Sequence, residues 1–141
     1  MKIKRRASVP YSPSQMFALV HDIESYPEFL PEISDVRILE RLEDSVSAEL
    51  EVHKGPVRET FATRNRLRPP EWMSMELVRG PFKHLHGEWH FVGDDSGSEV
   101  RFELEFEVKG FALRMILEPV VGRMADRLVD RFSQRAKVVY G

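Results

Sequence analysis

The spacing of apolar residues divides the chain into three parts. Between residues 34 and 109 apolar and polar residues alternate, which is the period of a strand that buries one face. The clearest run is 100–109, where every second residue is apolar and each residue between is charged. Clusters of Gly, Pro, Asp and Ser interrupt the alternation at five places. The pattern predicts six antiparallel strands joined by short connections.

The preceding part of the chain predicts one strand and two short helices. Residues 2–10 have the character of an opening strand, and the next residues have the signature of a helix N-terminus. Ser12 can cap the helix and Gln15 can complete a capping box, while the proline between them suits a first turn. We therefore expect a helix over residues 13–22, followed by a second short helix or turn between the prolines at 27 and 31.

After Gly110 apolar residues recur every three or four positions, which is the period of a helix. This stripe predicts one long C-terminal helix with one apolar side. Pro119 falls inside the stripe, and a proline in a helix interior costs about 3 kcal/mol. We therefore expect a break just before Pro119. The stripe consists of Leu117, Val121, Met124, Leu128, Phe132, Ala136 and Val139.

The order of these elements predicts an α+β protein. A seven-stranded antiparallel sheet can cover the apolar stripe of the last helix only by curving around it. The chain has 141 residues, of which 42% are hydrophobic. This length and composition suit a single domain over residues 1–141 with one core.

Charge and cysteine content narrow the classes of function. The 21 basic and 23 acidic residues give a net charge of -2, so no global positive field attracts nucleic acid, and we expect no DNA partner. The absence of cysteine excludes thiolate catalysis and thiolate metal sites. The N-terminus lacks the apolar run of a secretory signal, and no stretch approaches the roughly 18 apolar residues of a membrane span. We expect a cytoplasmic protein, with a position at the periphery of the inner membrane as a further option.

Four segments of the chain resemble one protein family. They are 22–31 (DIESYPEFLP), 61–65 (FATRN), 80–91 (GPFKHLHGEWHF) and 132–140 (FSQRAKVVY). In this order they resemble the coenzyme Q-binding family of START-related proteins, a polyketide cyclase-like (SRPBCC) group that also includes the bacterial ribosome association toxin. The resemblance extends over nearly the whole chain. It implies a helix-grip (START-like) fold with an apolar cavity between the sheet and the C-terminal helix.

The resemblance implies three functions. The first is non-catalytic binding of ubiquinone or another polyisoprenoid lipid by a carrier or chaperone that supports respiration, with no cofactor required and with transient membrane contact. The second is regulation of the ribosome through its large subunit, and the third is an enzyme of the polyketide cyclase type. A shared fold does not decide between them. We expect the first function, without enzymatic activity.

Candidate ligand-binding residues are the inward-facing positions of the predicted strands and the last helix. Aromatic side chains and flexible methionines suit a flat quinone ring and a prenyl tail, although the same residues could simply fill a core. The apolar candidates are Leu50, Phe61, Met75, Leu77, Trp89, Phe91, Phe102, Phe106, Leu117, Val121 and Met124. Strand phase adds Glu59, Thr63 and Asn65, which could orient a ligand head group or make structural hydrogen bonds.

Two further patterns have both a functional and a structural interpretation. His84, His86 and His90 share one predicted strand face, where alternate histidines can bind a metal ion. A solvated outer face is the simpler interpretation, and we predict no metal site. Glu59 is the only carboxylate that strand phase turns inward, which is too little for an acid–base site. We therefore assign no catalytic residue.

Four arginines repeat at every fourth position of the predicted last helix. They are Arg123, Arg127, Arg131 and Arg135. As a ridge on the outer side of the helix they could bind ribosomal RNA phosphate. Two aspartates lie one turn away and could pair with them, which makes an ordinary charged face the alternative.

Overall fold

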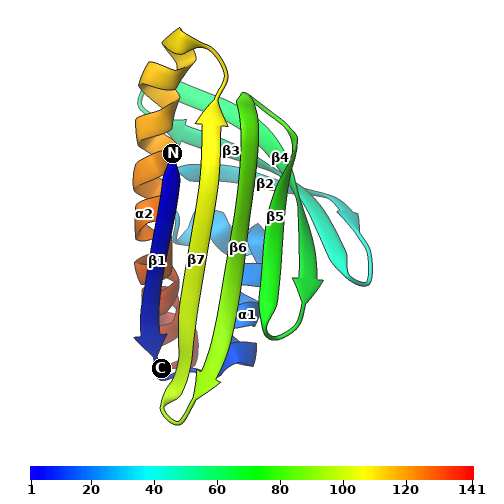
Figure 1. The fold of residues 1–141 in the computed structure, drawn as a ribbon, viewed down its shortest axis with the longest axis vertical. Helices are drawn as coiled ribbons and strands as arrows, with labels where there is room; N and C mark the ends of the chain where they lie inside the picture. Colours follow the sequence, from blue (N-terminus) through cyan, green and yellow to red (C-terminus); the bar gives the residue numbers. More distant parts are fainter.

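A seven-stranded antiparallel sheet curves around one long helix in the computed structural model, which describes residues 1–141 (Figure 1). The strands are β1 (Lys2–Val9), β2 (Ile33–Arg41), β3 (Ser45–Lys54), β4 (Val57–Arg68), β5 (Trp72–Arg79), β6 (Phe82–Asp94) and β7 (Gly97–Val108). The helices are α1 (Pro13–His21), the 3-10 helix η1 (Ile23–Glu28) and α2 (Phe111–Tyr140). This order confirms the α+β class, the presence of two short helices after the first strand and the six strands that follow. The second short helix was predicted at the wrong place: η1 begins at Ile23, before the prolines, and includes Pro27 instead of lying between the prolines at 27 and 31.

The sheet is a meander whose last strand pairs with the first. Its order is β1-β7-β6-β5-β4-β3-β2, and the neighbouring strands are antiparallel. Figure 1 shows the β1 edge running alongside α2, while the end of the sheet formed by β2, β3 and β4 crosses behind β7 and β6. One face of the sheet packs on α2 and the other faces water, so residues along β7 alternate between buried and less buried.

The predicted capping box starts α1 at the expected place. The Ser12 hydroxyl accepts a hydrogen bond from the Gln15 backbone N–H at 3.1 Å, and the Gln15 side chain accepts one from the Ser12 N–H at 2.9 Å. α1 contacts α2, β6 and β7. It buries Met16, Phe17, Leu19 and Val20.

The turn between β6 and β7 depends on a glycine. Gly97 has φ +147°, a backbone conformation that residues with a side chain rarely adopt. A Cβ atom added there would lie 2.2 Å from the carbonyl oxygen of Val9. The glycine therefore lets this turn approach the end of β1 closely.

Helix α2 is longer than predicted. It runs without interruption from Phe111 through Pro119 to Tyr140, so the expected break before Pro119 is wrong. Proline at this position removes the backbone hydrogen bond to the carbonyl of Met115. Met115 and Pro119 are both exposed, so water can bind the freed carbonyl group and lower the cost. No helix of the structure has an apolar stretch long enough to cross a bilayer.

The apolar stripe of α2 forms one side of the core. Leu128 is half-buried, and Val139, which was predicted to be buried, is exposed. The last turn of α2 makes its contacts through Tyr140, whose ring lies 5.8 Å from that of Tyr11 and whose hydroxyl donates to the Gln15 carbonyl. The other members of the stripe are buried as predicted: Leu117, Val121, Met124, Phe132 and Ala136.

Candidate functional site

An apolar cavity lies between the inner face of the sheet and α2. It has a volume of about 80 Å³ and is lined by 16 residues, of which 14 are hydrophobic. Helices η1 and α2 and strands β2 to β7 all contribute to its wall. The wall consists of Ile23, Tyr26, Leu30, Ile33, Leu50, Phe61, Thr63, Asn65, Met75, Leu85, Phe102, Leu104, Val121, Met124, Ala125 and Leu128.

Thr63 and Asn65 are the two polar residues on this wall. Both are buried, and the Thr63 hydroxyl donates a hydrogen bond to Asn65 Oδ1 at 3.1 Å. The side-chain nitrogen of Asn65 lies 3.9 Å from the sulfur of Met73, which is a weak acceptor. An amide group has two N–H donors, so a polar atom of a guest in the cavity would find a donor available at Asn65.

Two aromatic clusters occupy much of the remaining space between sheet and helices. One centres on Trp89, whose ring centroid lies 4.4 Å from that of Phe102 and 5.3 Å from that of Phe132. The other centres on Phe82, 5.5 Å from Phe61. This packing leaves the cavity a volume of only about 80 Å³.

Two arginines of α2 bind the last residue of η1 and the segment that follows it. Arg131 Nη1 lies 2.6 Å from Glu32 Oε2, and the two side chains are only 17% and 8% exposed. Burial by itself would raise the pKa of Glu32, but the hydrogen bond and charge of Arg131 outweigh burial and lower it. The Arg135 guanidinium lies 5.0 Å from the Phe29 ring centroid and 3.6 Å from Glu28. We call these contacts the latch.

We predicted that the four arginines of α2 form one continuous exposed ridge, and the latch shows that this prediction is wrong. Arg123 and Arg127 are exposed, but Arg131 and Arg135 turn toward the η1 side. A step of four residues turns about 40° around a helix of 3.6 residues per turn, so the ridge winds from solvent into the interior. Asp126 does not neutralise the ridge either, since it pairs with β1.

The structure divides the predicted ligand-binding residues into three groups. One group lines the cavity: Leu50, Phe61, Thr63, Asn65, Met75, Phe102, Val121 and Met124. A second group belongs to the packed core beside the cavity: Leu77, Trp89, Phe91, Phe106 and Leu117. Glu59 lies outside both groups. It has the predicted strand phase, opposite Val52, but it stands near the start of β4, beyond the part of the strand that reaches the cavity.

The residues predicted to bind a ligand make up half of the cavity wall. Leu85 and Leu104 share strand faces with predicted residues, so alternation could have assigned them to the wall. η1 and the residues after it have no regular period that would identify Ile23, Tyr26, Leu30 or Ile33. Tyr26 is held in place because its hydroxyl donates to the Val20 carbonyl, and burial raises its pKa. The remaining two are Ala125 and Leu128.

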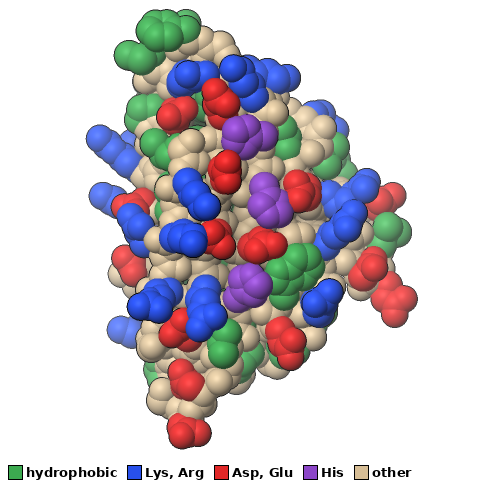
Figure 2. Space-filling view, viewed as in Figure 1, with side chains coloured by type: hydrophobic (Ala, Val, Ile, Leu, Met, Phe, Trp, Pro, Cys, Tyr) green, Lys and Arg blue, Asp and Glu red, His purple; other side chains and the backbone are tan.

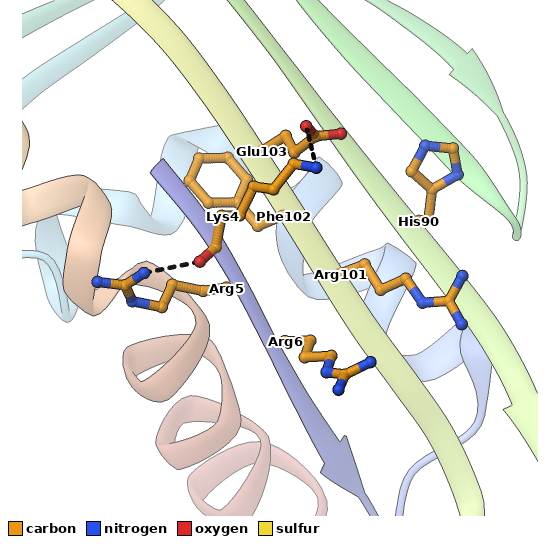
Figure 3. Close-up of a pocket in the computed structure, with 7 residues that line it drawn as sticks. All are labelled: Lys4, Arg5, Arg6, His90, Arg101, Phe102 and Glu103. Carbon is orange, nitrogen blue, oxygen red and sulfur yellow. Dashed lines mark hydrogen bonds and ion pairs between the residues drawn. The ribbon is translucent and has the colours of Figure 1, made fainter. Parts of the chain in front are cut away.

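A much larger depression lies on the opposite, solvent-exposed face of the sheet. It has a volume of about 680 Å³ and extends over β1, β7 and β6 (Figure 3). Figure 2 shows basic side chains gathered over this part of the sheet. Arg5 pairs with Asp126 of α2. The lining residues of this basic groove are Lys4, Arg5, Arg6, His90, Arg101, Phe102 and Glu103.

Two arginines occupy opposed strand positions in the basic groove. Arg6 and Arg101 are cross-strand partners, and like charges at opposed positions destabilise a sheet. Figure 3 shows the Arg6 side chain reaching from β1 toward β7 and that of Arg101 reaching from β7 toward β6. Arg101 Nε is 2.5 Å from Glu99, and Lys4 is 3.3 Å from Glu103, but Arg6 has no ion-pair partner. The groove thus keeps a positive charge that the protein does not neutralise.

The histidines of β6 lie on the same outer face, so the outer-face interpretation is confirmed. They form a column down the middle of Figure 2. His86 Nδ1 lies 2.6 Å from a carboxylate oxygen of Glu76, and His90 Nε2 lies 3.4 Å from one of Glu88. No three His, Asp or Glu side chains come together in a group that could hold a metal ion. The column is part of a surface network of ion pairs.

Comparison with known proteins identifies the family of this chain. The family model described as polyketide cyclase / dehydrase and lipid transport matches residues 9–133. The chain belongs to this family. The match confirms the resemblance expected from the four sequence segments.

Three curated relatives carry two kinds of name. The ribosome association toxin RatA of Pseudomonas aeruginosa is 40% identical over 99% of this chain and 97% of that protein. RatA of Escherichia coli K12 is 39% identical over 99% of this chain and 89% of that protein. The mitochondrial coenzyme Q-binding protein COQ10 of Drosophila melanogaster is 25% identical over 94% of this chain and 57% of that protein.

Solved structures agree on the helix-grip fold. The 18 kDa protein CC1736 of Caulobacter crescentus is 34% identical, with a TM-score of 0.78 and coverage of 100% of this chain and 99% of that chain. A START superfamily protein of Mycobacterium smegmatis is 21% identical, with a TM-score of 0.80 over 98% of both chains. The Zhui aromatase/cyclase of Streptomyces sp. R1128 is 18% identical, with a TM-score of 0.85 over 97% of this chain and 93% of that chain. At such low identity the last two share the fold alone.

Proposed function

We propose that this protein binds the ribosome through the basic groove on the outer face of its sheet. The main support for the proposal is the difference in size and charge between the basic groove on the outer face of the sheet and the apolar cavity on its inner face. The groove is open, cationic and about 680 Å³ in volume, whereas the apolar cavity has about 80 Å³. Relatives named ribosome association toxins, 38–40% identical over 99% of the chain, support the same interpretation. From the sequence we expected quinone or lipid binding as the main function. The proposal instead makes ribosome binding the main function.

The chemistry of the groove suits a phosphate-rich partner. A guanidinium group can donate two parallel hydrogen bonds to one phosphate, and charge-assisted bonds of this kind are stronger than neutral ones. Arg6 has no ion-pair partner, and Arg101, its cross-strand neighbour, pairs with Glu99 through Nε, which leaves its two terminal nitrogens for such contacts. Because the whole chain has a net charge of -2, attraction to RNA must come from a local surface rather than from the overall field.

Co-sedimentation with purified ribosomes and with separated subunits tests this proposal. The natural protein should sediment with ribosomal particles at about 50 mM salt and be released toward about 200 mM, because phosphate contacts release counterions. The double variant Arg6→Glu, Arg101→Glu should lose this salt-sensitive binding. The variant Arg123→Glu, Arg127→Glu is the matched control, since it changes the net charge equally on the exposed part of α2.

Each outcome of this experiment supports or rejects part of the proposal. Loss of binding in the groove variant, with binding kept in the helix variant, supports the groove. The reverse pattern would show that the ribosome meets α2 instead. If the natural protein sediments with no ribosomal particle at any salt concentration, ribosome binding itself is rejected. Which subunit retains the protein decides whether the large subunit is the partner.

A second candidate function is binding of a hydrophobic ligand, with ubiquinone or a similar lipid as the expected guest. The apolar wall, the available donor of Asn65 and the resemblance to COQ10 support it. Pockets for ligands of drug size measure about 300–1,000 Å³, so a polyisoprenoid quinone requires η1 and α2 to separate and the latch to open. Mass spectrometry of organic extracts from natively purified protein tests the idea, and extracts without lipid would reject it.

A cyclase-type reaction, the third function that the resemblance implied, has less support. Acid–base catalysis needs a titratable group within hydrogen-bond reach of the substrate. The cavity wall contains neither a carboxylate nor a histidine. The relatives at 38–40% identity are named as ribosome association toxins or, in one case, as a persistence and stress-resistance toxin, and these names denote no reaction. The absence of enzymatic activity stays a prediction, which turnover assays with aromatic polyketide substrates can test.

A further inference from the structure

A row of side chains extends the basic groove across the sheet onto β5 and β4. Strand register places Arg6 opposite Arg101, Arg101 opposite His90, His90 opposite Trp72, and Trp72 opposite Arg68. Directly opposed residues point to the same face of a sheet, so these five side chains are neighbours on the solvent face. We call them the cationic row. It joins four basic or titratable side chains to one large aromatic ring.

The cationic row differs from the rows on either side of it, which contain carboxylates. On one side Lys4 stands opposite Glu103, and Glu103 stands opposite Glu88. On the other side Ser8 stands opposite Glu99. Arg101 and His90 each contact one carboxylate of a flanking row, at Glu99 and Glu88, whereas Arg6 and Arg68 form no ion pair. The row therefore keeps positive charge that suits an anionic partner lying across the strands.

Trp72 adds a stacking surface to this charge. Of the two tryptophans, Trp89 is buried in the core, whereas Trp72 is partly exposed on the outer face. The Arg68 guanidinium lies 5.4 Å from the Trp72 ring centroid, and the Arg68 side chain is exposed. A planar guanidinium over an aromatic ring is a platform on which a nucleobase can stack.

We propose that the cationic row binds a single-stranded segment of RNA, with phosphates on Arg6 and Arg101 and a base stacked on the pair Arg68 and Trp72. The row spans four strand spacings of about 4.8 Å, or about 19 Å, which suits a run of a few nucleotides. A double helix keeps its bases stacked inside, whereas loops and single strands expose both base faces and phosphates. The inference rests on the proposed ribosome binding and names the kind of ribosomal element that is recognised.

Binding of a fluorescein-labelled oligouridylate of about 12 nucleotides, within the site sizes of single-strand binders, tests the inference directly. Trp72→Ala should weaken binding about tenfold at unchanged salt dependence, because it removes stacking but no charge. Arg101→Glu should lower the slope of log affinity against log salt by about 0.7 for each phosphate that the variant no longer binds. Trp72→Phe should retain most of the affinity. Double-stranded RNA of equal length should compete poorly.

A matched control separates stacking from a general loss of surface area. Val78 is an exposed apolar residue of the same strand as Trp72 but lies outside the cationic row, and Val78→Ala should bind like the natural protein. Circular dichroism melting checks that each variant is folded. Quenching of Trp72 fluorescence by the oligonucleotide, with Trp89 as the unchanged internal reference, should accompany binding.

The outcomes distinguish this inference from the proposed function. If Trp72→Ala binds the oligonucleotide as well as the natural protein does, or if duplex RNA competes equally well, the inference is overturned. Ribosome co-sedimentation that depends on Arg6 and Arg101 but not on Trp72 would reject the stacking platform and leave the proposed function standing. Oligonucleotide binding without ribosome binding would reject the proposed function and leave an RNA-binding protein with another target.

Discussion

The apolar cavity and the basic groove lie on opposite faces of the same sheet, share strands β6 and β7, and differ in size, polarity and exposure. Neighbouring residues of β7 contribute to both: Phe102 is buried toward the cavity, and Arg101 reaches into the solvent-filled groove. Inside, aromatic packing reduces the cavity to a small volume and favours stability. Outside, Arg6 and Arg101 repel one another at opposed positions. The opposed arginines cost stability and the fold does not require them, so the basic groove indicates a function more strongly than the well-packed cavity does.

The comparison predicts that changes on the inner side act on folding, while changes on the outer side act on binding. Phe132→Ala should have the largest effect, about 3–5 kcal/mol of unfolding free energy, because it removes a fully buried ring that packs on Trp89 and Tyr26. Urea unfolding measures this. Val138→Ala on the exposed side of α2 is the control and should change stability by less than about 0.5 kcal/mol.

Breaking the latch should have the next largest effect. Glu32→Gln leaves the largely buried Arg131 without its ion-pair partner and should cost about 3 kcal/mol at pH 7. The pKa of Glu32 is lowered in the folded protein, so its stabilising contribution exists above the ordinary glutamate pKa of about 4.3. That contribution is lost as the pH falls through the lowered value, because the unfolded chain then binds the proton more tightly.

Unfolding curves measured from pH 7 down to pH 3 check this sign. The stability difference between the natural protein and Glu32→Gln should shrink as the solution becomes more acidic. Glu40→Gln, at an exposed position of β2, should show no such convergence. A difference that stays constant over the whole pH range would show that the variant acts through packing rather than through the charge of Glu32.

Filling the cavity should have a smaller effect on stability. Val121→Phe adds volume to a wall residue and should cost about 1–3 kcal/mol through overpacking, since the cavity holds only about 80 Å³. Ribosome co-sedimentation of the folded variant should be unchanged, whereas any lipid in organic extracts should disappear. Loss of ribosome binding in this variant would show that the cavity and the basic groove are coupled and would weaken the comparison.

The smallest expected effect on stability has the opposite sign. Arg6→Glu places a negative charge opposite Arg101 and should stabilise the sheet by about 0.2–1 kcal/mol while it weakens ribosome binding. Lys4→Glu is the matched control, because it replaces an ion pair with Glu103 by a repulsion and should destabilise by a similar amount. Thermal melting at low ionic strength resolves the two shifts. If Arg6→Glu destabilises the protein, Arg6 contributes to folding, and the expectation that the outer face acts only in binding is wrong.

Local patterns in the sequence were sufficient for the fold. Alternation placed the strands, the capping box placed the start of α1, and the helical stripe placed α2 against the sheet, because these signals depend only on residues near one another in the chain. Two places differ from the prediction: η1 begins before the prolines that were expected to flank it, and α2 continues through Pro119, where water can bind the freed carbonyl group. The exposure of that carbonyl group depends on which side of α2 the sheet covers, so the local sequence could not reveal it.

The sites depended on distances that the sequence does not contain. It supplied most of the apolar side chains that could face inward, but which of them line the cavity and which fill the core depends on how closely α2 approaches the sheet. The pairing of Arg131 with Glu32 and the opposition of Arg6 and Arg101 each join residues about a hundred positions apart. Strand register and helix rotation bring them together, and both are set by packing over the whole domain. The sequence by itself therefore determined the elements and the family, and the tertiary structure alone decided where charge remains unneutralised and where space remains unfilled.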